Sequence, residues 1–136
     1  MYGNMLSRYS EPIYAAMRIV AGLLFACHGA SKLFGFFGDK GPTSDPTMIF
    51  AGAIEFFGGG MIALGLYAGI AAFLSSGLMA FAYFMVHAGK GLFPIENKGE
   101  LAVVYCFLFL YISAHGSGAF SLDRIIQKNR SSDHRK

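Results

Sequence analysis

Four long apolar runs limit what this 136-residue chain can fold into. A helix needs about 20 apolar residues to cross the hydrocarbon core of a bilayer. Windows of that kind lie at about residues 13–36, 48–67, 70–90 and 99–120. Water does not reach the hydrocarbon, so each run must satisfy its backbone hydrogen bonds internally, as a helix does. The runs therefore predict an all-α integral membrane four-helix bundle, antiparallel and up-down-up-down.

The composition of the chain agrees with lipid as its solvent. Hydrophobic residues make up 54% of the chain and charged residues 14%, whereas soluble domains carry about 25% charged residues. The 11 Lys and Arg residues are spread over loops and the C-terminal tail without a long basic run. We therefore expect the lipid bilayer as a partner and no nucleic acid. The N-terminus lacks the pattern of a cleavable signal peptide, so we expect the first run to remain as a helix.

The connections between the runs divide the chain into three parts. We expect an N-terminal segment over residues 1–12, a four-helix domain over 13–122 and a basic, partly disordered tail over 123–136. Only residues 67–69 separate the second run from the third. A connection this short predicts that those two helices pack side by side as an antiparallel hairpin.

Basic residues outside the runs predict which side of the membrane each connection faces. One side would hold six of them: Arg8, Arg124, Lys128, Arg130, Arg135 and Lys136. The other side would hold three, beside several acids: Lys40, Lys90 and Lys98. Because loops rich in Lys and Arg stay in the cytoplasm, we expect both termini to be cytoplasmic.

Ionisable residues inside the apolar runs are the first candidates for function, because a charge at membrane depth is costly unless it is paired or hydrated. Counting about 1.5 Å per residue puts four of them at similar depth in the outer third of the bilayer, on helices that converge: His28, Lys32, Glu55 and His87. We predict an outward-facing site in which these side chains transfer protons or bind a ligand. Glu55 is the strongest candidate, because its neighbours Ile54 and Phe56 are apolar.

Two further sets of polar residues complete the prediction. Three residues near the outer end are predicted to bind the ligand: Tyr83, Asn97 and Glu100. Three residues near the cytoplasmic end are predicted to be structural: Arg18, His115 and Asp123. In this second set, we expect Arg18 to pair with the carboxylate of Asp123 or to extend toward the interface.

Simpler interpretations of the outer residues stay open. One is that His28 and His87 lie at the level of the lipid headgroups and contact water alone, and that Lys32 extends its ammonium to the interface. Imidazole and carboxylate ligands suit several divalent ions, but no HxxxH or HxxE spacing fixes a geometry, so no metal site is predicted. Cys27 and Cys106 form no CxxC pair, and no disulfide is predicted.

Fragments in a fixed order along nearly the whole chain carry a family resemblance. They begin at Arg18 and read GLLFACHGASKLFG, AIEFFGGGMIALGLY, FMVHAGKGLFPIENKGELA and GSGAFSLD. Their order, with HGxxKL and SLD at the corresponding helix ends, resembles the DoxX family of small bacterial membrane proteins. That family is related to the DoxD subunit of thiosulfate:quinone oxidoreductase.

The resemblance implies a four-helix bundle in the bacterial inner membrane and an association with redox physiology, often alongside quinones or sulfur compounds. It does not imply an agreed reaction. The residues of this chain that match the family pattern are His28, Gly29, Lys32, Glu55, His87, Asn97, Glu100 and Asp123.

These observations lead to three hypotheses about function. The first is a redox-associated subunit that binds a quinone-like headgroup, with His28 or Lys32 donating protons and Glu55 relaying them. The chain has no haem CxxCH motif and no iron–sulfur cysteine set, so electrons would come through a quinone or a partner subunit. Whether such an oxidoreductase subunit is itself an enzyme stays open. The alternatives are a non-catalytic scaffold that binds a partner protein and a small transporter acting as a homo-oligomer.

Overall fold

The computed structural model describes residues 5–38 and 42–133, which are helical and contain no strand. Lys40, Arg135 and Lys136, which contributed to the predicted topology, lie outside these ranges. The main helices are α1 (Ser10–Phe34), α2 (Pro46–Ala53), α3 (Gly59–Leu64), α4 (Ala68–Ala82), α5 (Pro94–Asn97), α6 (Glu100–His115) and α7 (Leu122–Asp133). Two π-helical segments, η2 (Ile54–Gly58) and η3 (Tyr83–His87), and two 3-10 turns, η1 (Ser7–Tyr9) and η4 (Ala88–Lys90), extend them.

Local sequence explains where the second helix begins and ends. The side chain of Asp45 accepts a hydrogen bond from Thr47 N at 2.8 Å, and Pro46 occupies the first turn, where its missing N–H costs nothing. From there α2, η2 and α3 form one continuous helix that ends at Gly65, whose φ is +68°. The left-handed backbone conformation at this point suits glycine, and it reverses the direction of the chain into α4. The short connection predicted between the second and third spans is therefore present, but it lies at residues 65–67, because Ala68 and Gly69 already belong to α4.

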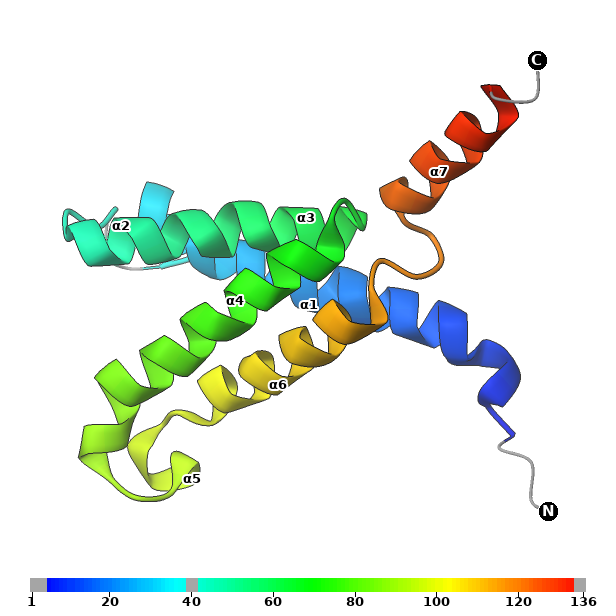
Figure 1. The fold of residues 1–136 in the computed structure, drawn as a ribbon. Helices are drawn as coiled ribbons and strands as arrows, with labels where there is room; N and C mark the ends of the chain where they lie inside the picture. The colour runs from blue at the N-terminus through cyan, green and yellow to red at the C-terminus, as the bar shows by residue number, and fades with distance from the viewer. Residues whose placement is uncertain (1–4, 39–41, 134–136) are drawn as a thin grey trace.

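The helices form two antiparallel pairs (Figure 1). The first pair consists of α1 and the continuous helix Pro46–Leu64, and the second pair consists of α4 and α6. The two pairs meet around the α3–α4 turn and diverge toward the opposite end, where α2 and α5 lie.

Small residues bring α1 into backbone contact with the continuous helix. A Cβ added to Gly22 would lie 2.5 Å from Ala63 N and 2.6 Å from Gly59 O, and a Cβ added to Gly59 would lie 2.5 Å from Ala26 N. No side chain fits between backbones at that separation. In membranes, where lipid is as apolar as the side chains, this close approach is a principal source of helix association.

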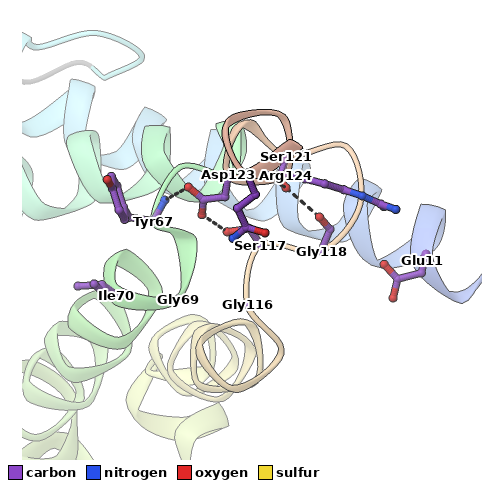
Figure 2. Close-up of a pocket in the computed structure, with 11 residues that line it drawn as sticks. Glu11, Tyr67, Gly69, Ile70, Gly116, Ser117, Gly118, Ser121, Asp123 and Arg124 are labelled. Atoms are coloured by element: carbon purple, nitrogen blue, oxygen red, sulfur yellow. Dashed lines mark hydrogen bonds between the residues drawn. The ribbon is translucent and has the colours of Figure 1, made fainter. Parts of the chain in front are cut away.

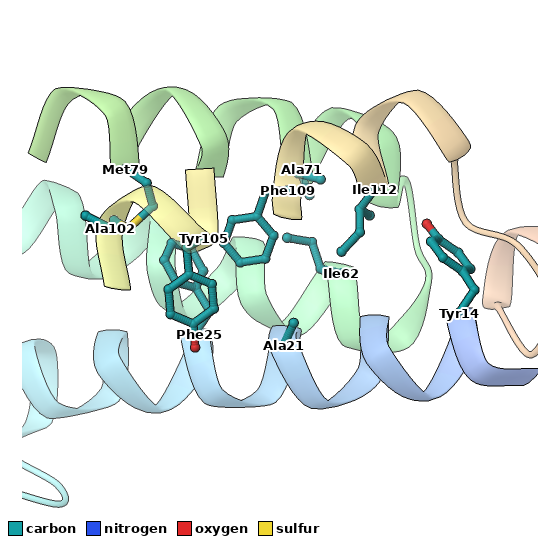
Figure 3. Packing of buried hydrophobic residues seen from close by; sticks show 11 residues of the cluster. Tyr14, Ala21, Phe25, Ile62, Ala71, Met79, Ala102, Tyr105, Phe109 and Ile112 are labelled. Carbon is teal, nitrogen blue, oxygen red and sulfur yellow. The ribbon is translucent and has the colours of Figure 1, made fainter. Parts of the chain in front are cut away.

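Aromatic side chains fill the junction of the two pairs (Figure 3). Phe25 of α1 packs against Phe109 of α6, with ring centroids 4.7 Å apart in an edge-to-face arrangement. Tyr105 stacks on Phe109 at 5.2 Å, and Ile62 and Ile112 close the layer with no exposed surface. Since rings packed in this way contribute beyond their buried area, this cluster holds the first pair to the second.

Three helical spans are long and apolar enough to cross a membrane: Ser7–Phe34, Pro46–Leu64 and Ala68–Lys90. The fourth apolar helix, α6, has 16 residues and is about 24 Å long at 1.5 Å per residue, shorter than the 99–120 window. That window was wrong at its C-terminal end, because Gly116 and Gly118 have φ of +84° and +63° and break the helix. Hydropathy did not detect the break, since apolar residues continue to Phe120.

The tail differs from the prediction of partial disorder. Residues 122–133 form the helix α7, which Figure 1 shows leaving the bundle after the loop that follows α6. Its start is fixed by Asp123, whose N–H donates to Gly65 O at 3.0 Å. Hydropathy indicates a soluble tail here, but it does not register apolar residues at helical spacing, such as Leu122, Ile125 and Ile126.

Candidate functional site

A groove of about 880 Å³ lies between the two helix pairs, at the end where they diverge. The four residues predicted as the proton-transfer and ligand cluster all line it: His28 and Lys32 from α1, Glu55 from η2 and His87 from η3. Apolar side chains of α2, α4 and α6 form most of the remaining wall. The groove therefore has a few polar groups within a largely hydrocarbon lining, which is typical of sites for small molecules.

An ion pair forms the polar centre of this groove. Lys32 Nζ lies 2.5 Å from Glu55 Oε1, and the Glu55 side chain is 3% exposed whereas that of Lys32 is 33% exposed. Among the residues that the structure describes, Glu55 Oε2 is a buried oxygen without a hydrogen-bond partner. A buried carboxylate oxygen is costly to leave unpaired, so Glu55 has an unused capacity to accept a hydrogen bond.

Both π-helical segments carry predicted site residues. Glu55 lies in η2, and Tyr83 and His87 begin and end η3. A π-helical turn adds a residue to the helix and changes the direction of the side chains around it, and such turns are frequent at functional sites. In this chain they turn Glu55 and His87 into the groove from different helix pairs.

The two histidines have different surroundings. His28 is exposed along α1, and its ring lies edge-on to Tyr105 at a centroid distance of 6.4 Å. His87 is half-buried, and its Nδ1 lies 3.0 Å from the carbonyl oxygen of Asn97. That carbonyl can accept only a proton carried by Nδ1, so the hydrogen bond leaves Nε2 of His87 to act as an acceptor.

The residues predicted to bind the ligand do not line the groove. Asn97 is 2% exposed and organises the connection to α6: its Nδ2 donates to the hydroxyl of Tyr83 and to Gly91 O, both at 3.1 Å, and its Oδ1 accepts from Gly99 N at 2.8 Å. Glu100 is exposed in the first turn of α6, where the helix dipole stabilises a carboxylate. Asn97 and Tyr83 therefore position His87 from behind the groove.

Two ionisable residues that line the groove were not selected from the sequence as site residues: Lys98 and Tyr105. Lys98 was assigned only to the outer interface. Tyr105 is 6% exposed, in the middle of α6. The position of Tyr105 in the middle of an apolar run could have marked it as a site residue, because tyrosines of the membrane belt occur near the ends of spans.

The predicted structural residues lie at the opposite end, where the two pairs meet. Arg18 has no exposed surface and donates to three carbonyl oxygens, Ile62 O at 2.5 Å, Ala63 O at 2.8 Å and Phe120 O at 2.9 Å. It neither pairs directly with Asp123 nor extends to the interface, so both expectations for its contacts were wrong. The carbonyls of Ile62 and Ala63 are at the C-terminus of α3, where helix dipoles favour a cation.

Asp123 and His115 complete this end of the molecule. Asp123 accepts from Tyr67 N at 3.0 Å and from the hydroxyl of Ser117 at 2.5 Å, beside a recess of about 560 Å³ (Figure 2). The His115 ring lies 3.8 Å from that of Tyr14, and its Nε2 is 3.6 Å from a carboxylate oxygen of Glu11. These contacts join the α3–α4 turn, the N-terminal part of α1 and the start of α7.

No three His, Cys, Asp or Glu side chains converge as metal ligands within residues 5–38 and 42–133. The two cysteines are not bonded to each other, and Cys27 faces outward from α1. The polar chemistry of the groove is that of two ammonium groups, a carboxylate, two imidazoles, a phenol and the Thr47 hydroxyl.

Three apolar spans and an interhelical groove with an ion pair at its centre define a helical integral membrane protein. The family model described as DoxX matches residues 13–88. The chain is also 44% identical over 127 residues to an uncharacterized protein of Haemophilus influenzae, covering 88% of this chain and 95% of that protein. No solved structure matches. The chain belongs to the DoxX family, and the resemblance noted in its sequence is confirmed.

Proposed function

We propose that this protein is a redox-associated subunit of the bacterial inner membrane that binds a quinone-like ligand in the groove between its helix pairs. The observation that supports this most directly is the carboxylate of Glu55, which pairs through Oε1 with Lys32 and keeps Oε2 unpartnered in the groove wall. A ligand hydroxyl or a protonated oxygen would satisfy that atom.

The polar groups suit the chemistry of a quinone headgroup. Reduction of a quinone to a quinol takes up two electrons and two protons, one proton on each carbonyl oxygen. The Lys32 ammonium and a protonated His28 can donate to these oxygens. Once Lys32 has given up its proton, the Glu55 carboxylate can take up a proton from the aqueous side and pass it to the neutral Lys32 amine across their 2.5 Å contact. The chain has only two cysteines, so the electrons come from a partner subunit in this proposal, and the reduced group is the ligand.

The apolar wall suits the hydrocarbon tail of such a ligand. Leu78, Phe81 and Met85 of the α4–η3 helix face Met48 and Ile54 across the groove. Burying hydrocarbon among these side chains is favourable by about 25 cal/mol per Å² of apolar surface removed from water. In a bilayer that gain is small, because lipid is also apolar, so specificity rests on the headgroup contacts.

Four membrane crossings and cytoplasmic termini are part of this proposal. At about 24 Å, α6 is shorter than a hydrocarbon core of about 30 Å, but it packs antiparallel to α4 along its length. Lys98 and Glu100 at its start and His115 at its end would reach the two interfaces. A reporter enzyme that works only in the cytoplasm should be active when it is fused after Lys136. If a reporter that works only outside the cytoplasm is active at the same position, this topology is wrong.

Extraction of bound lipids tests the ligand. Wild-type protein purified in mild detergent should retain quinone, and Glu55→Gln and His28→Ala should lose it. Glu100→Gln is the matched control, because Glu100 is an exposed acid outside the groove lining. Equal quinone content in wild type and Glu55→Gln would refute the proposal, and a stoichiometric protein partner without any quinone would favour the scaffold alternative.

A further inference from the structure

The helix α7 carries three partly exposed apolar side chains. Leu122, Ile125 and Ile126 are 37%, 56% and 40% exposed, and Figure 1 shows α7 directed away from the bundle. At 100° per residue the three side chains fall within an arc of about 100°. A helix with one narrow apolar face and an otherwise polar surface is amphipathic, so this face has an apolar environment available to it in the assembled membrane.

Basic residues flank that face on both sides. At the same angular spacing, Lys128 lies about 110° to one side of its centre and Arg130 about 90° to the other. Both side chains are exposed. Long basic side chains in these positions can place their charges among lipid phosphates while the apolar face enters the acyl region.

The start of α7 is held at the level where the spanning helices end. The N–H of Asp123 donates to Gly65 O, and its carboxylate accepts from Tyr67 N, both at 3.0 Å. Gly65 and Tyr67 belong to the turn between the second and third spans. Tyr67 in this turn is 59% exposed, and Phe120, in the loop before α7, is 74% exposed. An apolar surface therefore continues from the spanning region onto α7.

We propose that α7 is an interfacial helix that lies against anionic phospholipids, with its Leu122, Ile125 and Ile126 face in the acyl boundary and Lys128 and Arg130 at the phosphates. Charge complementarity selects this occupant: six of the 11 Lys and Arg residues of the chain belong to this end in the predicted topology, and anionic leaflets attract such clusters. The proposal is independent of the ligand in the groove.

Tryptophan fluorescence tests the contact, because the chain has no tryptophan of its own. Ile126→Trp places the probe on the apolar face, and Ser131→Trp places a matched probe on the same helix about 170° from the centre of that face. The full-length protein is reconstituted in vesicles of phosphatidylglycerol with phosphatidylcholine, or of phosphatidylcholine alone. With the anionic lipid, the probe at position 126 should emit at shorter wavelength and resist quenching by aqueous acrylamide, while the probe at position 131 should be quenched freely.

Charge removal distinguishes contact with anionic lipid from contact with a protein partner. Changing both Lys128 and Arg130 to Gln in the Ile126→Trp protein should weaken the contact, with each lost charge lowering its equilibrium constant about fivefold. Raising the salt to about 1 M, where the Debye length is about 3 Å, should act in the same direction. The proposal is overturned if both probes are quenched equally in anionic vesicles. It is also overturned if position 126 is protected equally in vesicles of phosphatidylcholine alone, which would show that the contact does not depend on anionic lipid.

Discussion

The contact between α1 and the continuous helix makes a sharp prediction at two adjacent glycines. A Cβ added to Gly59 would lie 2.5 Å from Ala26 N and 2.6 Å from Gly22 O, whereas a Cβ added to Gly60 meets nothing within 4 Å. The same substitution to alanine therefore tests packing at one position and helix propensity alone at the next. Both residues occupy the same helix, one position apart.

The expected magnitudes follow from these distances. The atoms facing Gly59 are backbone atoms, so an added methyl group can be accommodated only if the helices move apart by about 1 Å, and overpacking of this kind costs about 1–3 kcal/mol. Gly60→Ala should instead stabilise the helix by about 0.5–1 kcal/mol. Because Gly59→Ala gains the same helix propensity, the two variants should differ by the packing cost alone, about 1–3 kcal/mol in the free energy of unfolding.

Unfolding in mixed micelles with increasing SDS, followed by circular dichroism, measures that difference. Gly59→Ala should unfold at lower SDS fraction than wild type, and Gly60→Ala at the same or a higher fraction. Lys32 and Glu55 face each other across the same helix contact, so Gly59→Ala should also disturb the groove. If Gly59→Ala is as stable as Gly60→Ala, then α1 does not lie in backbone contact with this helix.

Three further predictions concern the groove and the junction. Gly77→Leu adds a side chain to the groove wall at a position where a Cβ meets no atom within 4 Å. This variant should therefore lose bound quinone with little loss of stability. The control variant Gly60→Leu lies outside the groove lining and should retain quinone. Lys32→Met should cost about 3 kcal/mol in SDS unfolding by leaving a buried carboxylate unpaired. Adding Glu55→Gln to that variant should recover most of the loss, and no recovery would refute the pairing. Arg18→Met should abolish folding in detergent by leaving buried carbonyls unpaired, and Arg18→Lys should rescue only partly because an ammonium lacks the guanidinium fork.

The sequence predicted the spans well because membrane helices obey one strong rule. Apolar length found three of the four helices within a few residues, and the missing N–H of Pro46 and the left-handed Gly65 explain the ends of the second. It failed where backbone conformation decides, as at Gly116 and Gly118, which end α6 early. Hydropathy sums side-chain transfer energies and does not detect a change in φ.

The site shows the same division between composition and geometry. Depth counting at 1.5 Å per residue put Lys32 and Glu55 at one level, and the structure brings these two side chains into contact. Depth counting did not distinguish Asn97, whose side chain holds the connection before α6 through hydrogen bonds, from His87, which lines the groove. The π-helical turns that orient Glu55 and His87 have no hydropathy signal, since they change side-chain direction without changing composition.

The distribution of polar residues over the two helix pairs has a mechanical consequence for the proposed ligand. His28, Lys32 and Glu55 all belong to the first pair, whose helices are held together by backbone contact. His87 belongs to the second pair and is held there by the Asn97 carbonyl. A headgroup that contacts both Glu55 and His87 must therefore bridge the pairs at the end where they diverge. Ligand affinity should then depend on the junction at the other end, because Phe25 and Phe109 fix the angle between the pairs. Phe109→Ala, which replaces no residue of the groove lining but removes the ring against which Phe25 and Tyr105 pack, should weaken quinone retention, and unchanged retention would show that the pairs act independently.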